Sequence, residues 1–147
     1  MALTLRRRAR SQRGAELIEL ALILPLLLFL IGGIVDFGLL FQAFQVVNSA
    51  AREGARLAIL PGYTETDVQN RVAAYVTAAG LAATPVTTRS VVAIANGGAG
   101  APVSTGYQVE VQYLHTFTLI SGLSALVGGA LPSTVTLTAR SVMRSET

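Results

Sequence analysis

Cysteine and lysine are missing from this 147-residue sequence, and its single histidine is His115. Without cysteine the chain has no disulfide, no thiol nucleophile and no cysteine-ligated metal site. His115 lies on the apolar face of an alternating segment, with no second histidine and no cluster of carboxylates to accompany it. We therefore interpret it as a core or edge residue of a strand rather than a ligand, and we expect neither a metal nor a cofactor.

Motifs of the common enzyme classes are also missing. The sequence has no nucleophile elbow, no phosphate-binding loop, no HExxH and no pair of carboxylates suited to a cleft. The polar residues of its second half are mostly threonine, serine and glutamine. We therefore expect a protein that is not an enzyme.

Charge is sparse and unevenly placed. Charged residues make up 13% of the chain, and all eleven basic residues are arginine. Five of them stand before Gly14, so the rest of the chain holds six arginines against eight acidic residues, a net charge of −2. The basic balance therefore belongs to the N-terminal end, and it gives no reason to expect a nucleic-acid partner.

A long apolar run follows this basic segment, with no charge from Leu20 to Val35. A bilayer core of about 30 Å needs roughly 20 apolar residues, which the run reaches when Leu17, Ile18 and the segment 37–41 are included. Arginines on one side predict a single-pass protein with a cytoplasmic N-terminus and an extracytoplasmic C-terminal head. A cleavable secretory signal is the alternative, but the run is long, contains Pro25 and lacks an Ala-x-Ala end.

Three acidic residues flank the apolar run, and such acids are costly near lipid and often functional. Cleavage after Gly14 would free an α-amine on Ala15, four residues before Glu19 on the same helical face. Glu16 also lies close to that new terminus. Asp36 follows a span of about 28 Å and is interpreted either as a contact to another subunit or, preferably, as the outer end of the span.

The same residues carry a family resemblance. Gly14 and Glu19 at the mouth of an apolar helix resemble a type IV prepilin processing site. The longer pattern is similar to the TadE-like proteins, pilin-like membrane proteins of the tight-adherence (Flp) pilus machinery. It consists of RGAELIELALILP from Arg13, VDFG from Val35, NSAAREGAR from Asn48 and, near the C-terminus, VTLTARSVMR from Val135.

This resemblance implies a minor pilin or pseudopilin that takes part in pilus assembly, adhesion and surface attachment from the cytoplasmic membrane. A prepilin peptidase would cut between Gly14 and Ala15, and Glu19 would pair with the N-terminal amine of a neighbouring subunit. Glu16 and Asp36 are further candidates for assembly contacts with pilin-like subunits and the assembly platform. Major pilins of this system have a tyrosine after the glutamate, whereas Leu20 stands here, which favours a minor component.

Two other functions stay open. A signal-anchored envelope protein would keep Gly14 uncut and bind a ligand or partner through its head. A secretion-system pseudopilin would be processed in the same way, although those proteins commonly begin with phenylalanine where Ala15 stands.

The expected fold is α+β. We expect a disordered basic leader (1–14), a transmembrane and spine helix (15–60) with a bend or local loss of helix near Ala21–Leu24 caused by Pro25, and a small head (61–147). The head should contain a helix over 65–79 with Thr64 and Asp67 in a capping box, and strands over 86–95, 107–118 and 134–144. Residues 96–102 should form a turn, and 119–131 a loop on the sheet or against the membrane surface.

Overall fold

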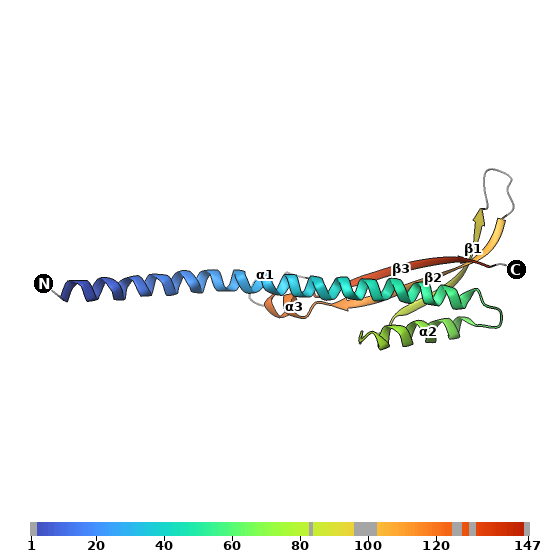
Figure 1. The fold of residues 1–147 in the computed structure, drawn as a ribbon, viewed down its shortest axis with the longest axis horizontal. Coiled ribbons are helices and arrows are strands. Elements are labelled where there is room, and N and C mark those ends of the chain that lie inside the picture. Colours follow the sequence, from blue (N-terminus) through green and yellow to red (C-terminus); the bar gives the residue numbers. More distant parts are fainter. Residues whose placement is uncertain (1–2, 83, 96–102, 125–127, 130–131, 146–147) are drawn as a thin grey trace. The chain divides into compact units, whose positions relative to one another are not determined.

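The computed structural model describes residues 3–82, 84–95, 103–124, 128–129 and 132–145. A long N-terminal apolar helix is followed by a short helix and three antiparallel strands, which confirms the predicted α+β class (Figure 1). The turn expected at 96–102 lies outside the described residues. In chain order the elements are α1 (Leu3–Ala58), α2 (Glu65–Ala78), β1 (Val86–Ala95), β2 (Val103–Thr116), α3 (Leu119–Ser124) and β3 (Thr134–Arg144).

Two compact units divide the chain. Met1–Phe37 and Thr118–Leu131 form one, called here the helix unit, and Gly38–Phe117 with Pro132–Thr147 form the other, the sheet unit. Helix α1 contributes residues to both. The boundaries after residues 14 and 60 that the sequence suggests remain predictions.

Helix α1 differs from the sequence-based expectation at two places. The leader was expected to be disordered, but the helix begins at Leu3, because leucine, arginine, alanine and glutamine are all good helix formers. Of the bend or local loss of helix predicted near Ala21–Leu24, the loss is wrong, since the helix continues through Pro25, and the bend stays a prediction. Proline removes one backbone hydrogen bond, and the turns on either side keep theirs.

The sheet has the order β1-β2-β3, with both neighbouring pairs antiparallel. Val86 of β1 pairs with Gln112, and Thr116 of β2 pairs with Thr134. Strand β2 begins at Val103, earlier than the expected Tyr107, and the predicted alternation of its side chains holds from Val109 to Thr116. In that part Val109, Val111, Tyr113 and His115 are buried, and Gly106 is buried nearer the start of the strand.

The core of the sheet unit lies between the second half of α1, α2 and the inner face of the sheet. Helix α1 contributes mostly small side chains, namely Ala43, Val47, Ala50, Ala51, Ala55 and Ala58. Gly54 marks the closest approach, because a Cβ built there would lie 2.8 Å from Cγ2 of Val72 and 3.2 Å from Cγ1 of Val109. Small residues on α1 therefore let α2 and β2 pack directly against its backbone.

Thr64 and Asp67 form the predicted capping box at the start of α2. The Thr64 backbone N–H donates to Asp67 Oδ2 at 2.8 Å, and the Asp67 N–H donates to Thr64 Oγ1 at 3.3 Å. The Thr64 hydroxyl also donates to Asp67 Oδ2 at 2.7 Å. These bonds satisfy backbone donors at the first turn and fix where α2 begins. Gly80 ends it with φ +81°, the left-handed conformation that glycine adopts readily.

We predict that Gly54→Ala and Gly38→Ala change stability in opposite directions. Alanine in place of an exposed helical glycine gains up to about 1 kcal/mol, and a Cβ at Gly38 would have no neighbour within 4 Å. At Gly54 the new methyl group overlaps the stiff Val72 side chain, an overpacking cost of about 1–3 kcal/mol. Thermal unfolding of the full chain in detergent, followed by circular dichroism, should show Gly54→Ala melting below Gly38→Ala; equal melting temperatures would contradict the close packing.

A second prediction concerns the pKa of Asp67. Hydrogen bonds from the Thr64 hydroxyl and backbone N–H hold the pKa of Asp67 below its ordinary value. The stabilisation from the ionised box is therefore complete above the ordinary carboxyl pKa of about 4 and is lost as the pH falls through the lowered value. Thr64→Val should raise the pKa of Asp67 in an NMR titration. The pKa of Glu110, which Gln112 and Arg140 hold low, should not move.

Candidate functional site

The predicted processing residues, Gly14 and Ala15, and two of the predicted assembly residues, Glu16 and Glu19, lie exposed on α1. A Cβ added at Gly14 would meet nothing within 4 Å. Because the helix is continuous here, Ala15 and Glu19 stand one turn apart on the same face. Glu16 lies one turn before Glu19 as well, so which acid pairs with a new N-terminus stays a prediction.

An apolar helix surface continues from Glu19 towards Asp36. Its large side chains are open to the surroundings, with exposed fractions of 67% at Leu17, 75% at Leu22 and 72% at Leu26. Among the described residues one helix, Gly14–Ala58, is long and apolar enough to cross a membrane, and its most apolar stretch is almost entirely unburied. Soluble proteins rarely expose so continuous an apolar patch. The helix therefore fits a single-pass membrane anchor.

Asp36 has a role within the chain that the sequence does not reveal. Its side chain is 1% exposed and accepts four hydrogen bonds from the first turn of α3. Oδ1 accepts from the N–H groups of Thr118 at 3.3 Å and Leu119 at 3.2 Å. Oδ2 accepts from the N–H groups of Leu119 at 3.0 Å and Ile120 at 2.7 Å. The carboxylate thus caps a helix 82 to 84 residues away in sequence.

Two properties of the helix start explain this contact. The first N–H groups of a helix have no partner within it, and the helix dipole favours negative charge at that end. The two ion pairs among the described side chains involve Glu53 and Glu110, not Asp36. Backbone dipoles therefore compensate the buried Asp36 charge.

Helix α3 itself corrects the expected loop at 119–131. The described part of that segment begins as a helix from Leu119 to Ser124, because Asp36 supplies the acceptors that its first turn needs. Two serine hydroxyls also donate to backbone carbonyls nearby: Ser121 to Thr118 and Ser124 to Ser121. Thr118 stands at the N-cap position, where threonine is favoured, but the segment is too short and too interrupted by glycine for this signal to predict a helix.

Arg89 on β1 is a second residue that sequence reasoning missed. Its guanidinium donates from Nη2 to the Ala58 carbonyl at 2.7 Å and from Nη1 to the Tyr63 carbonyl at 2.9 Å. It also stacks on Tyr107, with Cζ 4.2 Å from the ring centroid. A cation is favoured at the C-terminal end of a helix, so Arg89 satisfies the end of α1 and fixes the turn that follows.

The other charges described in the sheet unit lie at its surface. Arg52 and Arg56 are exposed, and Glu53 pairs with Arg71 of α2 at 2.7 Å. Glu110 and Arg140 form a cross-strand pair at 2.8 Å. Surface pairs of this kind each contribute about 0–1 kcal/mol to the stability of the fold, so they are a minor part of it.

His115 is buried in the sheet, edge-on to Phe117 with ring centroids 5.6 Å apart. Among the described residues no group of three or more metal-ligating side chains is found. His115 also borders an open hollow of about 320 Å³ between α1, the end of α2 and β2. Nothing in this setting gives the histidine a chemical partner beyond its packing.

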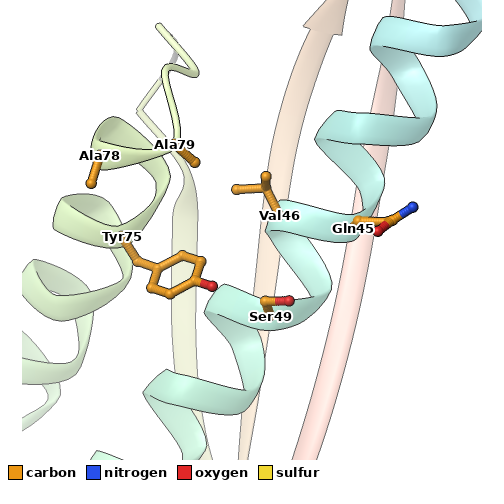
Figure 2. A pocket seen from close by; sticks show the side chains of 6 residues that line it. All are labelled: Gln45, Val46, Ser49, Tyr75, Ala78 and Ala79. Atoms are coloured by element: carbon orange, nitrogen blue, oxygen red, sulfur yellow. The ribbon is translucent and has the colours of Figure 1, made fainter.

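A further hollow of about 430 Å³ lies between α1 and α2 (Figure 2). The Tyr75 ring reaches from α2 towards Ser49 on α1 and is 39% exposed. The hollow is open to solvent and has no charged group. Its walls are Gln45, Val46, Ser49, Tyr75, Ala78 and Ala79.

Comparison with known proteins identifies the first helix. A family model described as TadE-like protein matches residues 14–56, which confirms the resemblance seen in the sequence. The matched stretch contains all five predicted site residues, from Gly14 to Asp36. The match covers the first helix alone, and through it this stretch is similar to proteins of the tight-adherence (Tad) pilus. No curated protein and no solved structure matches the chain.

We predict that Asp36→Asn loosens α3 while α1 stays helical. Asparagine keeps the shape but loses the charge and one acceptor oxygen, which costs about 1–3 kcal/mol when a buried donor is left unpaired. Hydrogen exchange of the full chain in detergent should show faster exchange at the Thr118, Leu119 and Ile120 amides. Glu16→Gln, an exposed carboxylate change on the same helix, should leave these amides protected. Unchanged protection in Asp36→Asn would show that the cap is dispensable.

Proposed function

We propose that this chain is a TadE-like minor pilin or pseudopilin that a prepilin peptidase processes after Gly14. It resides in the cytoplasmic membrane as a single-pass protein, with its N-terminus cytoplasmic and its sheet-containing part outside. From there it joins the assembly of the tight-adherence pilus, and through that pilus it contributes to adhesion and surface attachment. The helix, rather than any catalytic group, carries this function.

The single observation that supports the proposal is the family match to residues 14–56, which falls on the helix with the exposed apolar surface. The match includes the glycine, the two following acids and the apolar run in the order that processing and assembly require. The exposure of Leu22 and Leu26 leaves a surface that lipid covers before assembly and neighbouring helices cover afterwards.

Glu19, near the cut end, sets the offset between neighbouring subunits along the helix axis. Cleavage frees the Ala15 amine, and Glu19 lies one helical turn away from its own subunit's amine and within reach of a neighbour's. An unpaired carboxylate in lipid is costly, about 2.5–3.5 kcal/mol at the centre of a span, so a misplaced subunit is penalised. Apolar packing between helices then supplies the attraction, while the charge pair selects the correct offset.

Two alternatives make different predictions. A signal-anchored envelope protein would keep residues 1–14 and use a surface such as the hollow beside Tyr75 for a ligand or partner. A secretion-system pseudopilin would be cut in the same way but would act with a secretion apparatus. The presence of Tad pilus genes next to the coding gene would favour the pilus over the secretion apparatus.

The processing step is tested by Gly14→Leu. A peptidase must admit the backbone closely before the scissile bond, and a bulky side chain there should block cleavage. Immunoblots of cells that make the full chain should show the uncut form accumulating in the membrane. Gly33→Ala changes a helical glycine away from the cut, at which an added Cβ would meet nothing within 4 Å, and should be processed normally. Normal processing of Gly14→Leu would contradict the proposed cut.

The assembly step is tested by Glu19→Gln, which keeps the size of the side chain and removes its charge. The variant should be cleaved normally but should fail to support piliation and surface attachment. Glu16→Gln is the matched control, since it removes the other exposed acid within the same turn. Loss of piliation in Glu16→Gln alone would assign the pairing to Glu16, and full piliation in both variants would contradict a role for an acid at the helix mouth.

A further inference from the structure

Thr118–Leu131 leaves the sheet between β2 and β3 and groups with Met1–Phe37 in the helix unit. Its sequence contains no charged residue, and neither does the chain between His115 and Arg140. A connection between two strands normally carries polar residues, because it runs through solvent. This one is instead apolar, and its start, from Thr118 to Ile120, is bonded to Asp36 on the helix that contains the proposed membrane span.

The depth of the contact follows from the span. Leu17–Val35 is about 28 Å long as a helix, close to the thickness of a bilayer core, so Asp36 falls at the outer edge of the hydrocarbon. The N–H groups of Thr118 and Ile120 lie 3.3 and 2.7 Å from its carboxylate oxygens. The first turn of α3 is therefore fixed at the same depth.

The exposed side chains at this level fit lipid better than water. Phe37, the residue after Asp36, is 70% exposed, and Leu119 at the start of α3 is 42% exposed. The Asp36 carboxylate is buried and bound to backbone N–H groups, so it is shielded from direct contact with the surroundings. Both apolar side chains thus meet the boundary between headgroups and acyl chains with no exposed charge to oppose their insertion.

We propose that α3 is a membrane-surface element, seated by Asp36 in the outer headgroup region of the bilayer that α1 crosses. A single helix can rotate and slide in a membrane, and a second contact at one depth restricts both motions. Asp36 then acts as the positioning residue of this contact. The inference rests on the membrane insertion of α1 in the proposed function, but it needs neither processing nor a pilus.

The absence of cysteine allows a direct test with single-cysteine variants of the full chain. Leu119→Cys reports on α3, Leu26→Cys on the span and Thr138→Cys on an exposed position of β3. Each variant is labelled with a polarity-sensitive fluorophore and reconstituted in vesicles of phosphatidylethanolamine and phosphatidylglycerol. Quenching by lipids with a nitroxide at a shallow or a deep position gives the depth of each label.

We expect the Leu119 label to be blue-shifted and to be quenched more strongly by shallow nitroxides than by deep ones. The Leu26 label should be quenched most by deep nitroxides, and the Thr138 label should not be quenched. Adding Asp36→Asn should remove most of the quenching at Leu119 and leave Leu26 unchanged. A deep Leu26 label with an unquenched Leu119 label would overturn the inference alone. A blue-shifted but unquenched Leu119 label would mean that protein covers α3, which also overturns it. An unquenched Leu26 label would instead contradict membrane insertion itself.

Discussion

The apolar surface of α1 between Leu17 and Val35 is the constraint on which the structure depends. Full burial of one leucine side chain is worth roughly 1.5–3 kcal/mol, and this stretch exposes many such side chains at once. No single hydrogen bond or ion pair in the chain approaches that sum. Lipid or neighbouring helices must cover the surface, and the charged residues have to be arranged around that requirement.

The acidic residues nearest this apolar surface lie at its two ends. Glu16 and Glu19 stand at one end of the run, and Asp36 stands at the other with its carboxylate bonded to backbone N–H groups. In the sheet unit a positive charge serves the opposite end of a helix. Arg89 donates a hydrogen bond to the Ala58 carbonyl, which has no partner within α1 where that helix ends. Asp36 and Arg89 each connect α1 to a segment that is distant in sequence. Both contacts are made at the end of a helix.

Local patterns predicted much of the fold. The alternation from Tyr107 gave the inner face of β2, and the Thr64–Asp67 spacing gave the start of α2, because both signals lie within a few residues. The capped α3 and the bonds of Asp36 and Arg89 were not predictable in this way, since their partners lie 26 to 84 residues away. The helical leader was missed for another reason: its charge suggested disorder, whereas its residue types favour helix once α1 extends through them.

The candidate site divides along the same line. Gly14, Ala15 and Glu19 could be proposed from the sequence because a processing signal is a local sequence pattern. The family match covers that stretch, and the roles of these residues stay predictions. Asp36 was identified as a notable acid from its place after the apolar run, but its burial and its role as a cap depend on the tertiary fold. A sequence can therefore point to such a residue while leaving its partner to the structure.

The central claim is that the working protein is a lipid-embedded helix whose basic leader has been removed. Its most direct test is mass spectrometry of the N-terminal peptide from membranes of native cells, washed with alkaline carbonate to strip peripheral proteins. The account predicts a chain in the washed membrane that begins at Ala15. A chain that retains Arg13, or one released entirely into the wash, would contradict it.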